Sequence, residues 1–204
     1  MKTPFLIGIA GPSGSGKSAL AHRLALAYDA PIISLDHYYR DLAHLSLAER
    51  ASTNFDEPAA IDLSLLLSQI QSLRAGQAVE IPNYDFAQHT RAATGDRVTP
   101  HDIIIVEGLF TLYWHELLNL LDTRVFVDLD DHSCFERRAE RDLVERGRTR
   151  ECVERQYRTT VRPMAETYIL PTKCNADVVV RGDWNIEASV SAVMLHCDAV
   201  LSNH

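Results

Sequence analysis

The sequence predicts an α/β fold in which helices cover both faces of a parallel sheet, and three observations lead to this prediction. Short apolar segments, typical of buried strands, alternate with segments of helical composition along the 204 residues. The most continuous apolar segment, residues 102–106, reads Asp-Ile-Ile-Ile-Val, as expected of a strand covered on both faces. A glycine-rich turn at residues 11–18 joins the first apolar segment to the first helical one. The length fits one domain, residues 1–204, with at most a small inserted lobe.

Composition and charge limit the class of protein. Hydrophobic residues make up 46% and charged residues 24% of the chain, which is ordinary globular composition. The formal net charge of −8 disfavours a general nucleic-acid partner, because neutralising phosphates needs an excess of Lys and Arg. Residues 137–162 nevertheless hold nine Arg against five acidic residues, which suggests a local site for a phosphate-sized anion.

The cysteines and the apolar segments indicate the cellular setting. Cys134, Cys152, Cys174 and Cys197 show no CxxC spacing and have no His cluster beside them, which disfavours a disulfide framework or a zinc site. The apolar residues 5–10 are too few for a secretory signal, and no segment is long enough to span a membrane. We therefore expect a cytoplasmic protein with no membrane partner.

Residues 5–18 predict a strand, a phosphate-binding loop and the start of a helix. The loop satisfies GxxxxGK[ST], whose glycines let backbone N–H groups turn toward a phosphate at a helix N-terminus. Lys17 would add charge at the outer phosphates, and Ser18 would offer its hydroxyl to Mg²⁺. A glycine turn that only starts a helix is disfavoured, because a strand precedes the loop and a helix follows it. The residues of this predicted nucleoside triphosphate site are Gly11, Pro12, Ser13, Gly14, Ser15, Gly16, Lys17, Ser18 and Ala19.

The second predicted strand, residues 31–35, ends at Asp36. Ligands bind at the carboxyl ends of strands in open parallel sheets, so Asp36 is placed for catalysis. A helix-capping or loop aspartate is an equal alternative. Further on, Asp62 is predicted to cap an amphipathic helix that ends near Gly76.

Residues 79–101 are predicted to form a small insertion. Its polar loop, residues 83–91, holds two aromatic residues, a His and an Arg. Exposed aromatic rings beside hydrogen-bonding groups suit a planar ligand such as a nucleobase. Standing alone, such a loop is more often a hairpin tip with partly buried rings.

The strand predicted at residues 102–106 is followed by Glu107 and Gly108. A carboxylate at this end of a strand, across from the phosphate loop, is placed to hold Mg²⁺ directly or through water. A helix cap is the alternative, but the flanking glycine allows close backbone approach and favours the functional interpretation. Residues 123–128 predict a further strand.

Residues 131–145 predict an arginine-rich helix that Gly147 interrupts. The region of about residues 138–160 has the features of a lid that closes over phosphates and excludes water. A solvated helix is the alternative, because several acidic residues lie four positions before an arginine, as Asp142 does before Arg146. Arg148 has no such acid before it and is the predicted lid residue.

The remaining chain predicts a helix at residues 152–168, a strand at 176–181 and a C-terminal amphipathic helix. The apolar stripe of that last helix, residues 190–201, is predicted to cover the core or to contact a second subunit. The fold class is therefore a P-loop NTPase-type parallel sheet with helices on both faces, a small insertion and an Arg-rich lid.

In order and spacing, the motifs resemble those of the uridine kinase (uridine-cytidine kinase) family over nearly the whole chain. The resembling segments are GPSGSGKS (11–18), DHYYRD (36–41), NFDEPAAID (54–62), PNYDFAQHTR (82–91), VEGLF (106–110), FVDLDDHSCFERRAERDLVERGR (126–148), QY (156–157), LPTK (170–173) and ADVVVRGDWN (176–185). Three places depart from the family pattern: Glu57 stands where His is usual, Thr149 where an acid is usual, and Cys174-Asn175 where a more basic pair is usual.

The resemblance implies ATP-dependent, Mg²⁺-dependent phosphorylation of the 5′-hydroxyl of uridine or cytidine, a step of pyrimidine salvage. It implies that Asp36 is the general base, that Lys17 and Arg148 act on the transferring group, and that Ser18 and Glu107 hold the metal. Besides the phosphate loop, the implied ATP-binding residues are Arg141, Arg146 and Asn185. The implied nucleoside-binding residues, which also make residues 79–101 a nucleoside-binding insertion, are Tyr39, Asp56, Tyr84, Phe86, His89, Arg138 and Gln156. Because family members are commonly tetrameric, a homo-oligomer is expected.

Two alternatives stay open. A related phosphate-loop kinase could act on another hydroxylated metabolite, as phosphoribulokinase and pantothenate kinase do, but residues 84–91 argue against it. A regulatory nucleotide switch, which is a binding protein and not a metabolic enzyme, would need a guanine-reading NKxD string that the sequence lacks.

Overall fold

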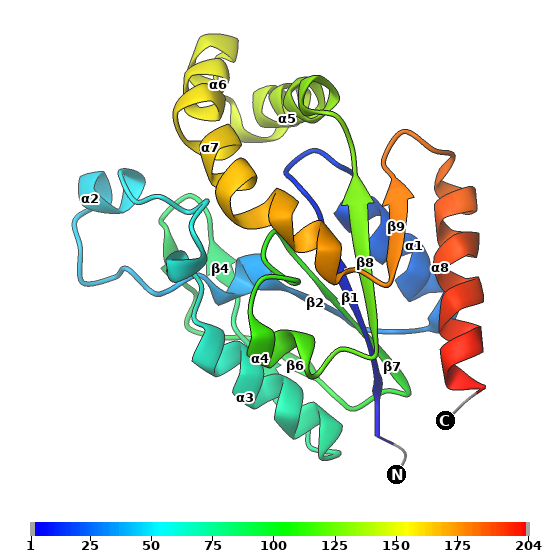
Figure 1. Ribbon diagram of the computed structural model, residues 1–204. Coiled ribbons are helices and arrows are strands. Elements are labelled where there is room, and N and C mark those ends of the chain that lie inside the picture. The colour runs from blue at the N-terminus through cyan, green and yellow to red at the C-terminus, as the bar shows by residue number, and fades with distance from the viewer. Residues whose placement is uncertain (1–2, 203–204) are drawn as a thin grey trace.

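Five parallel strands form the central sheet of the computed structural model, which describes residues 3–202 apart from the side chains of residues 51, 145 and 146 (Figure 1). The strands are β1 (Phe5–Ala10), β2 (Ile32–Ser34), β7 (Ile103–Glu107), β8 (Thr123–Asp128) and β9 (Val178–Arg181). Their order is β2-β7-β1-β8-β9, and each neighbouring pair is parallel. The predicted α/β class is confirmed, and the carboxyl ends of the strands meet at one edge of the sheet.

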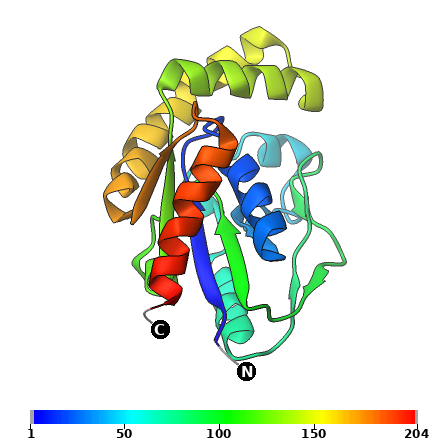
Figure 2. The same ribbon diagram turned by 90° about the vertical axis from the view of Figure 1, so that its right-hand side faces the viewer.

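Helices cover both faces of the sheet, because successive side chains of a strand point to opposite faces. On one face, Ile7 and Ile9 belong to the same buried cluster as α1 (Lys17–Tyr28) and α8 (Ile186–Leu201), which lie side by side in Figure 2. On the other face, Leu6 and Ala10 pack in a second cluster with α3 (Leu63–Arg74). The sheet is thus the middle layer of three, as the alternation of strands and helices predicts.

The segment from residue 131 to residue 175 is helical almost throughout; it begins at the top of the molecule in Figure 1 and runs down toward its middle. Helix α5 (Asp131–Arg146) ends at Gly147, whose φ of 60° is left-handed. The following elements are α6 (Arg150–Gln156), a π turn (Tyr157–Val161), α7 (Arg162–Met164), a second π turn (Ala165–Ile169) and a 3₁₀ turn (Leu170–Asn175). Pro163 lies between the π turns and lacks a backbone N–H, which favours a changed hydrogen-bond pattern there. The helix predicted at residues 152–168 is therefore present but irregular.

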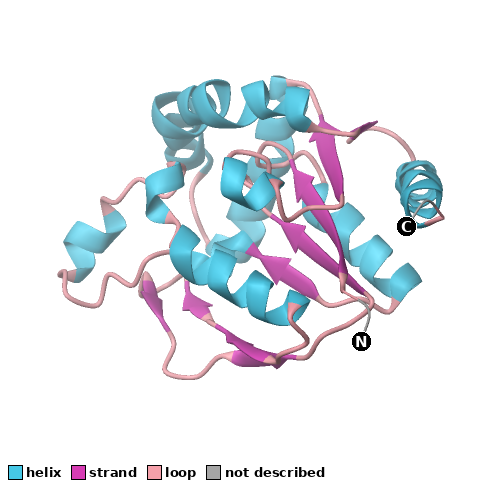
Figure 3. Cartoon of the chain, turned by 60° about the horizontal axis from the view of Figure 1, so that its bottom comes forward, coloured by secondary structure: helices cyan, strands magenta, loops and turns pink. Residues whose placement is uncertain are grey.

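Residues 79–98 form two small antiparallel pairs below α3 (Figure 3). Strand β3 (Val79–Ile81) pairs with β6 (Asp96–Val98), and β4 (Tyr84–Asp85) pairs with β5 (Thr90–Arg91). The polar loop predicted at residues 83–91 is thus a hairpin, and it buries the ring of Tyr84. The hairpin interpretation is therefore correct for the backbone. Contact between this hairpin and a ligand depends on its side chains.

Short helices and turns complete the chain. They are the 3₁₀ turn η1 (Leu35–Tyr38), α2 (Leu47–Ala51), the 3₁₀ turn η2 (Pro58–Ala60) and α4 (His115–Leu118). In α3, the side chain of Asp62 accepts a hydrogen bond from the N–H of Leu65, so the predicted cap is confirmed. In α8, Val190, Val193 and Cys197 are buried, which shows that this part of the stripe covers the core. Within residues 3–202, no helix is both long and apolar enough to cross a membrane.

Candidate active site

The phosphate loop lies between β1 and α1 with other parts of the chain pressed against it. Gly14 has a left-handed φ of 85°, and a Cβ built on it would overlap the carbonyl oxygen of Cys134 in α5. From the other side, a Cβ on Gly182 would overlap the carbonyl oxygen of Ser15. Gly16, with φ of 99°, is the N-cap of α1. The loop therefore approaches α5 and the turn after β9 more closely than any side chain would allow.

Two cavities border this loop. The first, which we call the aromatic cavity, has a volume of about 460 Å³ and is lined by Ser13, Lys17, Asp36, Tyr39, Phe55, Asp56, Tyr84, Phe86, Ala87, His89, Leu109, Arg138, Arg141, Arg148 and Gln156. The second, which we call the α1/α8 cavity, has a volume of about 510 Å³ and is lined by Ser15, Gly16, Ala19, Leu20, His22, Arg23, Val127, Arg137, Val180, Arg181, Gly182, Trp184, Ile186 and Ser189. Because loop residues line both, a phosphate chain bound in the loop can have a different group at each end.

Glu107 is a buried carboxylate that two serines hold. Ser18 of the phosphate loop donates to its Oε2 at 3.1 Å, and Ser34 donates to its Oε1 at 2.8 Å. Ser34 is the residue that faces Glu107 across the β2/β7 pair. Its hydroxyl also accepts a long hydrogen bond, 3.4 Å, from the N–H of Asp36. One serine, which the sequence interpretation missed, thus connects the predicted metal carboxylate to the turn that carries the predicted base.

The donor set around Glu107 fits Mg²⁺ in a nucleotide site. Among residues 3–202, no group of three or more His, Cys, Asp or Glu side chains could hold a metal by itself. Mg²⁺ is typically bound through one or two carboxylates together with phosphate oxygens and water, and not by a cage made only of protein groups. Ser18 and Glu107 provide a hydroxyl and a carboxylate next to the loop, which is what such a site needs from the protein.

The walls of the aromatic cavity are aromatic rings from residues that lie far from the phosphate loop in the sequence. The rings of Phe55 and His89 are stacked, with centroids 4.9 Å apart and planes inclined by 16°. Tyr39 contacts both Phe55 and Tyr84, at centroid distances of 5.2 and 5.3 Å. Phe86 is half exposed at the rim, with 50% of its surface accessible. These rings give the cavity aromatic walls, which suit a planar group. Phe55 is the wall that sequence reasoning missed, although it directly precedes Asp56.

Burial sets the protonation of the polar groups on these rings. Desolvation raises the pKa of Tyr84 to about 12, and burial raises the pKa of Tyr39 well above its usual range, so both phenols keep their protons. The pKa of His89 is lowered, first by desolvation and then by the charge of Arg148. Its imidazole is therefore neutral at physiological pH, and it can both donate and accept a hydrogen bond.

Arginines from α5 and its C-terminal turn line the aromatic cavity on the side of the region predicted to be a lid. Arg138 is buried and donates to the hydroxyl of Ser13 at 3.0 Å. The amide oxygen of Gln156 accepts from Arg148 at 2.7 Å and from Arg138 at 3.5 Å. The structure thus brings together the predicted lid residue and two predicted nucleoside-binding residues. The side chain of Arg146 lies outside the described residues.

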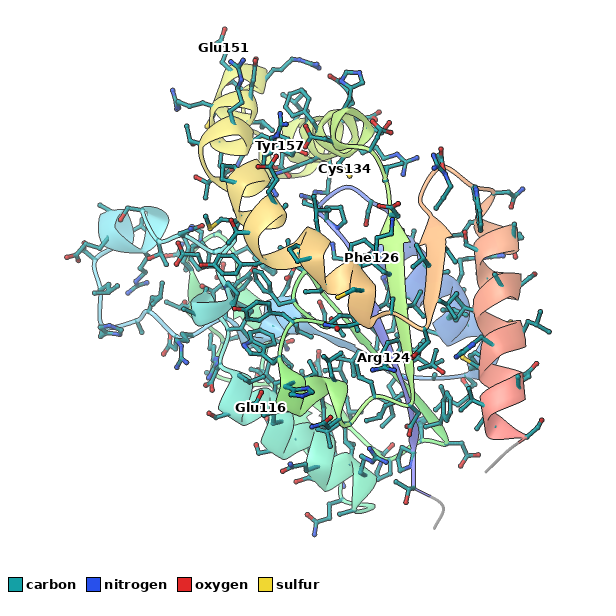
Figure 4. All side chains as sticks on the ribbon, in the orientation of Figure 1. Glu116, Arg124, Phe126, Cys134, Glu151 and Tyr157 are labelled. Carbon is teal, nitrogen blue, oxygen red and sulfur yellow. The ribbon has the colours of Figure 1, made fainter. Side chains whose placement is uncertain are left out.

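The segment after α6 is tied to α5 by Tyr157, whose position Figure 4 shows near Cys134. The hydroxyl of Tyr157 donates to the carboxylate of Asp131 at 2.8 Å. Its ring packs against Phe135, with centroids 5.1 Å apart. These contacts hold the C-terminal end of α6, where Gln156 lies, against α5.

The turn after β9, which carries the implied ATP-binding residue Asn185, borders the α1/α8 cavity. Trp184 and Arg181 line the cavity, as does Ala19 of α1. Asn185, by contrast, is not among the lining residues, and its side chain accepts a hydrogen bond from the N–H of Glu187 at 2.9 Å as the cap of α8. The structure therefore gives Asn185 a capping contact and places Trp184 beside the cavity.

Comparisons with known proteins identify a matching family model, related sequences and a related fold. A family model described as Phosphoribulokinase / Uridine kinase family matches residues 6–183. A uridine kinase of Staphylococcus epidermidis is 42% identical over 183 residues, which cover 88% of this chain and 88% of that protein. A uridine kinase of Lactobacillus helveticus is 40% identical over 206 residues, 99% of this chain and 98% of that protein. The solved phosphoribulokinase of Rhodobacter spheroides has a TM-score of 0.63 at 17% identity, over 89% of this chain and 71% of that chain, and shares the fold.

Proposed function

We propose a function for this chain from the premise that it belongs to the phosphoribulokinase/uridine kinase family and is a kinase with a P-loop fold. The proposed reaction transfers the terminal phosphoryl group of ATP to the 5′-hydroxyl of uridine or cytidine, giving UMP or CMP for pyrimidine salvage. The donor's base would occupy the α1/α8 cavity, and the acceptor nucleoside would occupy the aromatic cavity.

A single observation carries this proposal. The aromatic cavity brings the phosphate-loop lysine Lys17 and the strand-end carboxylate Asp36 together with the aromatic walls. A hydroxyl on a group held between those walls would face both a proton acceptor and the phosphate end of the loop. Positioning of this kind, with charge around the moving group, is most of what phosphoryl transfer requires.

The chain's own residues divide the work of the reaction. Asp36 would accept the proton of the attacking hydroxyl, and Lys17 and Arg148 would stabilise negative charge on the transferring group. Ser18 and Glu107 would hold Mg²⁺, which supplies charge neutralisation between the outer phosphates when bound. Closure of residues 138–160 over the cavity would exclude water, so that the nucleoside hydroxyl and not water is the acceptor.

Polar groups at the deep end of the cavity suit a ribose. Asp56 and Arg138 are buried, with 8% and 6% of their surfaces exposed, and Gln156 lies beside Arg138. A carboxylate and an amide can accept from the 2′- and 3′-hydroxyls, and a guanidinium can donate to them. Tyr84 and His89 would then meet the edge of the base, where their protonated phenol and neutral imidazole can read its donors and acceptors.

The test is an acceptor panel with ATP and Mg²⁺, in which ADP release is measured. Uridine and cytidine should be phosphorylated, while pantothenate and ribulose 5-phosphate should not support turnover. Turnover only with one of the other acceptors would assign the cavity to a different hydroxylated metabolite. Nucleotide binding without any acceptor-dependent ADP release would instead favour a regulatory switch.

A further inference from the structure

The carboxylate of Asp142 lies among three arginines that all line the aromatic cavity. Its Oδ1 accepts from Arg141 Nη2 at 3.0 Å, and its Oδ2 accepts from Arg148 Nη1 at 3.2 Å. Arg138 Nε lies 3.8 Å from the same Oδ2. Asp142 itself has 0% of its surface exposed and does not line the cavity.

The sequence pattern predicts a different role for this residue. Asp142 lies four positions before Arg146, which is typical of a solvated ion pair on a helix surface. The structure buries the carboxylate, which Arg141 and Arg148 both contact. A buried charge is destabilising unless good partners surround it, so these contacts are part of the fold and not an exposed ion pair.

The arginines need such a partner because they repel one another. Three guanidinium groups that face one cavity would separate into solvent if nothing of opposite charge lay between them. The backbone adds to the arrangement, since the carbonyl oxygen of Asp142 accepts from the N–H of Arg148 at 3.2 Å across the left-handed turn at Gly147. Both the main chain and the side chain of Asp142 therefore fix where Arg148 points.

We propose that Asp142 is a positioning residue that holds Arg138, Arg141 and Arg148 in the geometry that phosphoryl transfer needs. It acts through these arginines and touches neither substrate. The inference rests on the proposed function, because that function is what assigns the arginines to the phosphates and the ribose. Gln156 supports the same arrangement from α6, where its amide oxygen accepts from both Arg138 and Arg148.

Measuring kcat and ATP affinity separately distinguishes positioning of the arginines from their electrostatic attraction for ATP. In Asp142→Asn the shape is kept and one negative charge is lost, so the arginines attract ATP at least as strongly but point less accurately. Misplacement of about 1 Å costs on the order of 10²-fold in rate. We therefore expect kcat to fall by about 10²-fold. The Kd of a nonreactive ATP analogue should stay equal or become smaller, and the analogue should still bind at one site per chain.

The matched control is Glu136→Gln. Glu136 lies on the same helix and also pairs with an arginine of the lid region, Arg150, at 2.7 Å, but this pair is largely exposed. Its removal should change kcat less than threefold, as expected for an exposed ion pair. A double-mutant cycle of Asp142→Asn with Arg148→Gln completes the test, since a residue that acts partly through Arg148 should cost less activity once Arg148 is already lost.

Several outcomes would overturn the inference. They are unchanged kcat in Asp142→Asn, weaker analogue binding in proportion to the loss of kcat, or losses that are additive with Arg148→Gln. If Asp142→Asn does not fold, a cycle between Arg141→Gln and Arg148→Gln replaces it, and additive losses in that cycle would count against a shared carboxylate. All comparisons use whichever acceptor the wild-type enzyme phosphorylates, so a failure of the pyrimidine assignment remains separate from a failure of this one.

Discussion

The phosphate loop and the aromatic cavity are neighbours that are built in opposite ways. The loop consists of eight consecutive residues, and its function depends on backbone N–H groups and on glycines that let other segments approach. The cavity is lined by side chains that range from Ser13 to Gln156 and come from several strands, turns and helices. We therefore expect changes in the loop to be severe and to affect the donor. Changes in the cavity should be graded and should affect the acceptor, except where a residue touches the reacting atoms.

The largest effect should come from Asp36, where the two regions meet. Asp36→Asn keeps the size of the side chain but removes the proton acceptor, so kcat should fall by about 10²- to 10⁴-fold. Binding of ATP and of the nucleoside, measured separately by calorimetry, should survive. Asp41→Asn is the matched control, because Asp41 is exposed, lies five positions further on and does not line the cavity. Wild-type turnover in Asp36→Asn would remove Asp36 from catalysis.

The next effect tests whether the loop depends on close backbone approach. Gly14→Ala places a Cβ on the carbonyl of Cys134 and in a left-handed conformation that costs about 1–2 kcal/mol by itself. Gly147→Ala is the control, since Gly147 is also left-handed but a Cβ there meets nothing within 4 Å. The free energy of unfolding should fall further in Gly14→Ala, and its affinity for ATP should fall with it. Equal losses in the two variants would show that conformation alone matters at Gly14.

A smaller effect is expected at the far wall of the aromatic cavity. His89 has a φ of 51°, which Asn tolerates better than Ala, so His89→Asn tests the imidazole with little backbone strain. Loss of one or two hydrogen bonds of about 1–1.5 kcal/mol each should raise the KM of the nucleoside by about tenfold or more, with the KM of ATP unchanged. The exposed His115→Asn serves as the control. A change confined to ATP would mean that the hairpin does not face the acceptor.

The smallest expected effect is a change of the nucleoside KM with pH that depends on His89. Desolvation and the charge of Arg148 lower the pKa of His89, so the folded protein binds fewer protons here than the unfolded chain does once the pH falls below about 6.5. His89 thus contributes a loss of stability toward acid. The nucleoside KM should be flat from about pH 8 to 6.5 and should rise a few-fold at lower pH, as the imidazolium loses its acceptor. In His89→Asn this rise should be absent, and a rise of equal size would assign it to another group.

The sequence predicted some parts of these two regions and not others. The strands at 5–10 and 123–128, the cap at Asp62 and the end of α5 at Gly147 follow from local patterns, and the structure confirms them. The hairpin at residues 83–91 was expected only as what such a loop more often is, and its strands could not be located, because period-2 pairing over two residues per strand is too short to be detected from sequence.

What the sequence by itself determined is the alternation of strands and helices and the phosphate loop, because both depend on neighbours along the chain. Only the tertiary structure decided that Ser34 holds Glu107, that Phe55 stacks on His89 and that Asp142 lies buried among arginines. The physical reason is that burial and charge pairing depend on which segments meet in space. The spacing of Asp142 and Arg146 is typical of a solvated ion pair, and only the tertiary structure shows that the Asp142 carboxylate is buried.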